Sequence, residues 1–444
     1  MELAEDYALR ALQQTLHMSG QFVPDAVAPA LRLRGDVAVA DATSAAALLR
    51  GMSPLSHALR VRRLHVDDNL GGGGPGAVDP AGDVPLVPRQ PRGPSALLEA
   101  LGDARAQPSL RALHLGYVAG GDLSWLVYRH VLGADGTPLH DEAAAEARLG
   151  ALVDAACCRR LTALSLSFDN TSAREVARLL RSCRTLRSLC LWSHFASPHI
   201  IRSPGDWHVT AKDAVLLAEA LPAAPALEGF AFVGAGAFYD PRAGSALLAA
   251  AAAAPRLRAL VLDDSALPRL ENASHDICNP PFDPLTRTTE EITQAAERAH
   301  AAALQALCAL LAYGAPQLRC LRLAHCWVEP HAARELLAAA ERRTGAPLRL
   351  LDLRENTVQL EGQLLTQAPS CGGMTRVLTS VDNELQERRF AWGIHSLDTM
   401  RRAGTYNCLN PYPSGAISNT ATRAIDALQE AMAVAAEDNL ELPR

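Results

Sequence analysis

Residues 316–326 read PQLRCLRLAHC, and the pattern inside this stretch decides the fold. Leucine recurs at Leu318, Leu321 and Leu323 in the spacing L-x-x-L-x-L, and Pro316 stands just before the first of them. Alternation of apolar and polar residues over a short run is typical of a strand with one buried face. A proline in front of it ends a preceding helix and favours extended backbone. The stretch therefore predicts a short strand that follows a helix.

The same template returns along the chain, and each copy is followed after three residues by a position where small or polar residues predominate. The eight copies begin at Val61, Leu110, Leu161, Leu186, Leu227, Leu257, Leu318 and Leu348. Stretches rich in alanine and leucine with helical spacing lie between them, at 172–181, 211–221, 242–251 and 331–341. A unit of strand and helix that repeats in this way predicts a solenoid, because neighbouring units must stack to bury their apolar faces.

The motif P-x-L-R-x-L-x-L resembles that of the leucine-rich repeat proteins, and specifically the ribonuclease-inhibitor-like subclass, whose repeats of about 28 residues alternate a strand with a full helix. The resemblance covers approximately residues 55–357. It implies an α/β fold, a horseshoe-shaped solenoid with parallel strands on the concave face and helices on the convex face. In that family an asparagine after the strand satisfies backbone groups of the turn. Asn69 and Asn356 occupy this position, and Ser265 and Cys326 are candidate substitutes.

The repeats divide the chain into three predicted parts. Residues 1–54 form an N-terminal helical cap, with helices at 3–17 and 43–50 and a weak strand within 31–39. Residues 55–357 hold the repeats. Residues 358–444 hold a degenerate repeat, with a strand within 374–383, and a C-terminal cap that ends in a helix at 420–436.

Four of the intervals between template copies are long, and the extra residues follow the strand each time. They lie near 71–94, 119–140, 195–210 and 267–288, and we expect them to be inserted loops on one face of the solenoid. The alternative is that the intervals of 49, 51 and 61 residues contain degenerate repeats.

Composition narrows the classes of function. The formal net charge of −6 removes the broad positive field that nonspecific binding of nucleic acid or of anionic membranes needs. No apolar run reaches the roughly 18 residues of a membrane helix, and the acidic start MELAEDYALR differs from a targeting signal. The ten cysteines form no CxxC pair, so we expect reduced thiols. These features predict a cytoplasmic protein with neither a nucleic-acid nor a membrane partner.

No motif for catalysis or for a cofactor stands out. The only lysine, Lys212, lies outside any glycine-rich loop, which excludes a phosphate-binding P-loop. Histidines of one inserted segment lack cysteine or carboxylate partners at zinc-like spacing: His194, His199 and His208. The residue types of a thiol hydrolase occur without a family signature at Cys371, His395 and Asp398. We therefore expect no enzyme activity, no cofactor and no metal.

Side chains at the outward positions of the strands predict a binding surface on the concave face. Aromatic residues gather in the middle repeats and charged residues towards both ends, as in protein interfaces with apolar anchors inside a polar rim. The candidate partner-binding residues are His65, Asp67, His114, Tyr117, Phe168, Trp192, His194, Asp263, Arg322, His325, Asp352 and Arg354.

A ladder of arginines follows the first residue of the template in most copies, at Arg62, Arg111, Arg187, Arg258, Arg319 and Arg349. These arginines are either solvated consensus positions paired with nearby carboxylates or a rim that binds an acidic partner.

The predicted function is a non-catalytic protein-protein interaction module or scaffold. It would bind a protein partner of unknown identity through the concave repeat surface and the inserted loops, because a curved solenoid offers an extended surface. The family resemblance also implies two alternatives, a regulator of a small GTPase and a substrate adaptor of a ubiquitin ligase. The chain lacks the strongly acidic tail often found with the first, and its N-terminal part has no recognisable ligase-docking box for the second.

Overall fold

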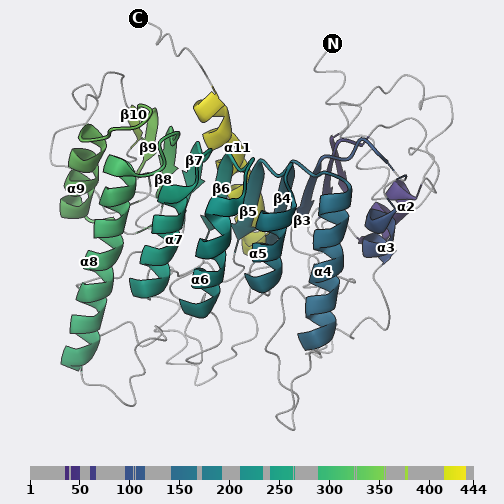
Figure 1. Ribbon diagram of the computed structural model, residues 1–444, viewed down its shortest axis with the longest axis horizontal. Coiled ribbons are helices and arrows are strands. Elements are labelled where there is room, and N and C mark those ends of the chain that lie inside the picture. Colours follow the sequence, from purple (N-terminus) through teal and green to yellow (C-terminus); the bar gives the residue numbers. More distant parts are fainter. Residues whose placement is uncertain are drawn as a thin grey trace, which may run out of the picture. The chain divides into compact units, whose positions relative to one another are not determined.

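The computed structural model of the chain consists of two compact units. Its strands and helices are labelled in Figure 1. Unit 1 consists of Met1–Leu189 and Tyr412–Ile425, and unit 2 of Cys190–Pro411 and Asp426–Arg444. The residues that the structure describes are 36–39, 42–50, 61–66, 96–103, 105, 107–115, 142–167, 173–192, 211–233, 241–263, 265, 289–324, 326, 328–354, 356, 376–378 and 415–436.

In unit 1, parallel strands alternate with helices. The strands pair in chain order and are β1 (Asp36–Val39), β2 (Arg63–Val66), β3 (Ala112–Leu115) and β4 (Ala163–Ser167). The helices pack each against the next and are α2 (Ala42–Leu49), α3 (Ala96–Gly102), α4 (Glu142–Cys158) and α5 (Ala173–Ser182).

Unit 2 repeats this arrangement. Its parallel strands are β6 (Gly229–Val233), β7 (Ala259–Val261), β8 (Cys320–Arg322), β9 (Leu350–Asp352) and β10 (Arg376–Leu378). Its helical layer consists of α6 (Ala211–Ala220), the short 3-10 helix η4 (Leu221–Ala223), α7 (Pro241–Ala253), α8 (Thr289–Tyr313) and α9 (Pro330–Glu341). Strand β5 (Ser188–Trp192) and helix α11 (Gly415–Ala436) contribute residues to both units.

The template predicts the strands correctly. Each of its eight copies contains one of the strands β2 to β9. The weak strand, the degenerate strand, the second helix of the N-terminal part and the final helix correspond to β1, β10, α2 and α11. The α/β class with parallel strands is confirmed. The predicted helix at 3–17 and the four inserted segments lie outside the described residues.

Template leucines form the core between the strands and the helical layer. Leu321 and Leu323 of the quoted stretch are at most 1% exposed, and the alternation of a strand turns Cys320 and Arg322 to the opposite face. We call this opposite face, which points away from the helical layer, the distal face. Polar residues of the template therefore collect on the distal face of each unit.

A side-chain ladder joins three consecutive repeats of unit 2 just after their strands. The Ser265 hydroxyl donates to the Phe232 carbonyl at 3.0 Å, and the Cys326 thiol donates to the Leu262 carbonyl at 3.0 Å. Asn356 accepts from the amides of Cys326 and Val328 and donates to the Leu323 carbonyl. Ser265 and Cys326 thus do substitute for asparagine, as the sequence suggests, because each reaches back to the preceding repeat.

Two arginines close the ends of helices in the repeat before their own. In unit 1, buried Arg159 donates to carbonyls at the end of α3, namely those of Ala100, Leu101, Asp103 and Gln107. In unit 2, Arg343 donates to the Leu311 carbonyl in the last turn of α8. It also donates to carbonyls that follow this helix, those of Gly314, Ala315, Leu318 and Ala346. The carbonyls that a helix leaves unpaired at its C-terminus are satisfied in this way.

Candidate partner-binding surface

The structure describes seven of the twelve candidate partner-binding residues. Five lie outside the described residues: Asp67, Tyr117, Phe168, His194 and His325. The other seven lie on the strands or directly after them: His65, His114, Trp192, Asp263, Arg322, Asp352 and Arg354.

Five of these seven side chains have little contact with solvent. His114, Trp192, Asp263, Arg322 and Asp352 are all buried, with exposed fractions of 7% or less. Their burial has a physical reason in unit 2, where the charged groups pair with one another and with helix α11. Whether any of the seven described residues contacts a partner stays a prediction.

Arg322 of β8 is the centre of a buried charge network on the distal face of unit 2. Its guanidinium donates to Asp263 at 3.1 and 3.2 Å and lies 3.6 Å from Asp352 of β9. Asp352 is fully buried and also accepts from Arg354 at 2.6 Å. Asp263 uses its second oxygen to accept from the Ala324 amide. Each buried charge therefore has a partner of opposite sign.

The network sets the protonation of its arginines. Burial alone would lower the pKa of Arg322, but the carboxylates of Asp263, Asp352 and Glu430 raise it above its ordinary value. The pKa of Arg354 is also raised, mainly by its hydrogen bonds to Asp352. Both guanidinium groups stay charged at every pH at which the protein is folded, so they are permanent anchors for a carboxylate.

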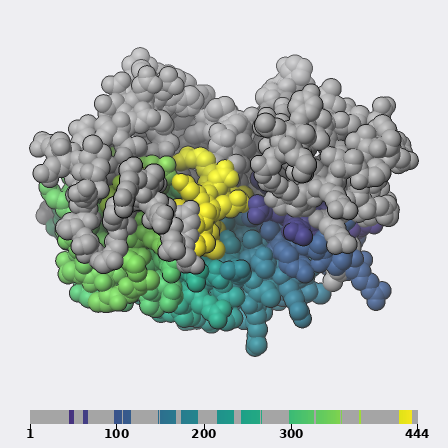
Figure 2. All heavy atoms as spheres, turned by 90° about the horizontal axis from the view of Figure 1, so that it is seen from above, coloured from purple at the N-terminus to yellow at the C-terminus, as the bar shows by residue number. Residues whose placement is uncertain are grey.

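The last part of helix α11 lies on this network. Glu430 pairs with Arg322 and lies 3.6 Å from Arg354, although half of its side chain is exposed. In Figure 2 the yellow atoms of α11 lie against green and teal atoms of unit 2. The distal face of unit 2 thus holds a helix by its carboxylate.

Apolar contacts and the end of the helix complete the seat of α11. A Cβ atom at Gly229 of β6 would lie 2.9 Å from Met432 Cγ and 3.2 Å from Leu428 Cδ1. Gly229 therefore leaves the space into which these two side chains pack. Arg319 and Arg349 donate to the carbonyls of Ala435 and Val434 at 3.4 and 3.5 Å, where the negative end of the helix dipole favours cations.

These contacts distinguish between the two interpretations of the arginine ladder at two of its positions. Arg319 and Arg349 contact polar backbone groups of a helix that lies on the distal face. Arg111 of unit 1 instead donates to carbonyls near its own strand, those of Pro108, Leu110 and Arg159. The same template position therefore contacts a helix that is distant in the sequence in some repeats and the backbone near its own strand in another.

The distal face of unit 1 carries a row of histidine and serine side chains instead. His65, His114 and Ser165 are aligned by the register of β2, β3 and β4, and the rings of His65 and His114 are 6.3 Å apart. Burial, followed by the nearby charges of His65 and Arg63, lowers the pKa of His114 to about 3. Among the described residues, no hydrogen-bond partner is found for either ring nitrogen of His114 or for the Ser165 hydroxyl.

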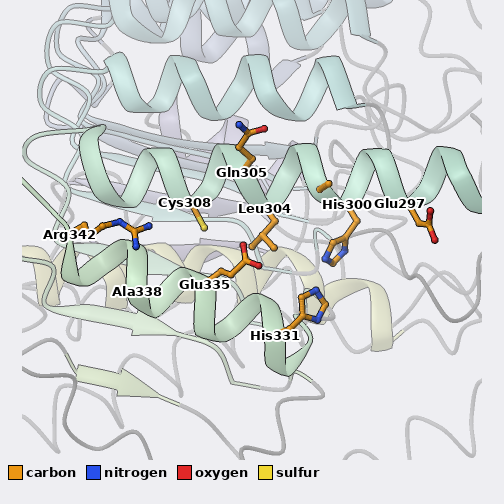
Figure 3. A pocket seen from close by; sticks show the side chains of 10 residues that line it. Glu297, His300, Leu304, Gln305, Cys308, His331, Glu335, Ala338 and Arg342 are labelled. Atoms are coloured by element: carbon orange, nitrogen blue, oxygen red, sulfur yellow. The ribbon is translucent and has the colours of Figure 1, made fainter.

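A groove on the helical layer of unit 2 also collects chemically active side chains (Figure 3). It lies between α8 and α9 and has a volume of about 540 Å³. His300 and His331 face each other there with ring centroids 5.6 Å apart, and Glu329 lies 3.2 Å from His331 Nδ1. Burial and the neighbouring Glu335 raise the pKa of Cys308, which keeps that thiol protonated. Among the described residues, no three side chains converge in a way that could hold a metal ion.

The thiols agree with the expected reduced state. None of the seven described cysteines is in a disulfide, and burial raises the pKa of Cys157, the first of an adjacent pair, to about 11. No helix among the described residues is long and apolar enough to cross a membrane.

Sequence reasoning missed Glu430, Leu428 and Met432 as part of the surface. The sequence does carry one signal for them, because buried and exposed residues alternate along α11 with helical spacing and its apolar side needs a partner. Which strands would provide that partner cannot be read from the pattern. Comparisons with protein-family models and with curated proteins find no match to this chain.

Proposed function

We propose that the chain is a non-catalytic protein-binding module or scaffold, built as a leucine-rich repeat solenoid, that takes a protein partner on the distal face of its strands and on the neighbouring inserted segments. One observation carries the proposal: the distal face of unit 2 holds helix α11 through Glu430, in a seat made by side chains of four strands or of the residues beside them. A surface that recognises a helix of its own chain has the charge and the shape to recognise a partner.

The template and the side-chain ladder support the solenoid. Ser265, Cys326 and Asn356 make the same backward contact in three successive repeats, as the asparagine ladder of the family would. The free thiols support a reducing compartment, and we propose the cytoplasm. Rigid stacked repeats would present their distal residues without a large cost in conformational entropy.

Photo-crosslinking tests the proposed function with four matched arginine positions. A photoreactive amino acid replaces Arg63 or Arg354 on the distal face, or the exposed Arg174 of α5 or Arg334 of α9 on the helical layers. All four variants make the same chemical change in the full chain. We expect the two distal variants to capture the same protein in source cells and the two helical variants to capture none of it. Capture from the helical positions alone, or from neither set, would overturn the proposal.

A further inference from the structure

We propose that the seat of α11 in unit 2 is a binding site for a helix of the partner, and that α11 is a built-in ligand which the partner helix displaces. This inference rests on the proposed function and deepens it, because it names the chemistry of the partner. The partner segment is an amphipathic helix with an acidic residue between two apolar residues. Its C-terminal end lies on the seat.

The contacts of α11 specify that pattern. Leu428 and Met432 are four residues apart, so they lie on one face of the helix, and both pack above Gly229. Glu430 lies between them in the sequence and pairs with Arg322 of β8. The carbonyls of Val434 and Ala435 meet Arg349 and Arg319 where the helix ends. A helix with other spacings would lose at least one of these contacts.

The charges of the seat favour an acidic ligand. Among the described residues, four guanidinium groups contact Glu430 or the end of α11: Arg319, Arg322, Arg349 and Arg354. Glu430 and the negative end of the helix dipole of α11 supply the matching negative charge. A carboxylate at the position of Glu430 pairs with Arg322 and lies near Arg354, whereas a basic residue there would be repelled by both.

Part of the seat is held together by contacts that do not involve α11. The buried contacts of Arg322 with Asp263 and of Arg354 with Asp352 join strand residues to each other and do not involve the helix. The ion pair of Glu430 is half exposed, and pairs of that kind are worth roughly 1 kcal/mol or less. A partner helix displaces α11 when it binds the seat more strongly than α11 does, and α11 contributes both its buried apolar side chains and its attachment to the same chain.

A labelled peptide tests this inference in the full chain. The probe is a fluorescein-labelled peptide with the sequence of residues 415–436, and its control carries arginine in place of the glutamate at the position of Glu430. The protein variant is Glu430→Arg, which places a third cation beside Arg322 and Arg354 and releases α11. The matched variant is Glu297→Arg, which makes the same change of charge at an exposed position of α8.

We expect the probe to bind Glu430→Arg at least tenfold more tightly than the wild-type chain or Glu297→Arg, and the control peptide to bind none of them measurably. Hydrogen exchange over residues 426–436 is measured in parallel and should accelerate only in Glu430→Arg. In the Glu430→Arg background, Gly229→Leu fills the apolar part of the seat and should lower the affinity for the probe at least tenfold.

Two results would overturn the inference. If α11 exchanges faster in Glu430→Arg but the probe gains no affinity, the seat does not bind a helix in trans. If exchange stays slow, α11 is a permanent part of the fold and not a displaceable ligand. Both results differ from a failure of the proposed function, in which the peptide would bind as expected while photo-crosslinking from Arg63 and Arg354 captured no partner.

Discussion

The distal faces of the two units accommodate polar side chains in opposite ways. In unit 1, the row runs from His65 through His114 to Ser165, and burial lowers the pKa of His114 to about 3, so that this imidazole is buried without charge at neutral pH. In unit 2, the corresponding strand positions include Arg322 and Asp352, which are buried with their charges and paired. The two rows occupy the same place in the repeat, so the template alone does not decide between them.

The difference teaches that burying a polar side chain on the distal face can destabilise the fold in two ways. A neutral polar side chain that is buried without hydrogen bonds lowers the stability of the fold. A buried charged side chain lowers it when a partner of opposite charge is missing. Unit 2 should therefore be sensitive to the loss of a single charge, whereas unit 1 should be sensitive to pH. The predictions that follow separate the two cases.

The largest effect is expected for Arg322→Met. The substitution removes the cation between Asp263 and Asp352 and leaves their buried carboxylates with less compensation, which we expect to lower the free energy of unfolding by about 3–5 kcal/mol. Urea unfolding followed by circular dichroism measures the change. Adding Asp263→Asn to the variant should recover part of the loss. If Arg322→Met were as stable as the wild type, the charge network would not be a structural requirement of unit 2.

Arg343→Lys and Arg159→Lys test a feature that the units share. Lysine has three N–H donors, whereas Arg343 meets five carbonyls and Arg159 meets four, so each substitution leaves carbonyls at a helix end unpaired. We expect each to lose roughly 2–3 kcal/mol. The exposed Arg334→Lys of α9 serves as the control and should change little. Equal stabilities for all three variants would mean that charge alone suffices at the helix ends.

His114→Leu should reveal the sensitivity of unit 1 to pH. The folded pKa of His114, about 3, lies below the ordinary value of 6.5, so only the unfolded chain binds this proton between these two values. Stability is therefore complete above pH 6.5 and falls as the pH drops, by about 1.4 kcal/mol per pH unit. At about pH 5 the wild type should have lost about 2 kcal/mol that His114→Leu retains. Parallel curves of stability against pH for the two proteins would contradict the prediction.

Glu430→Gln should have the smallest effect. The Glu430 side chain is half exposed, so the loss of its ion pair with Arg322 should lower the free energy of unfolding by less than about 1 kcal/mol. The same urea titration measures it. A loss as large as that of Arg322→Met would show that α11 and the buried network are one unit, which would also weigh against displacement of α11.

The fold follows from the sequence more completely than the surface does. The template places β8 at Cys320–Arg322 because leucine spacing and Pro316 are local signals. The exposure of Arg322 could not be predicted in the same way, because its burial depends on Asp352 in the next repeat and on Glu430, which is more than a hundred residues away in the chain. Periodicity indicates which face a side chain takes but not which distant helix covers that face.

Three side chains that complete a repeat come from the repeat after it, and this has a consequence for synthesis on the ribosome. Arg343 closes the end of α8, Arg159 closes the end of α3, and Asn356 completes the turn that holds Cys326. Each of these repeats therefore leaves the exit tunnel before the residues that finish it have been translated. Folding of the nascent chain should lag translation by about one repeat, so that a ribosome paused before codon 343 carries an α8 whose last carbonyls are still bound only by water.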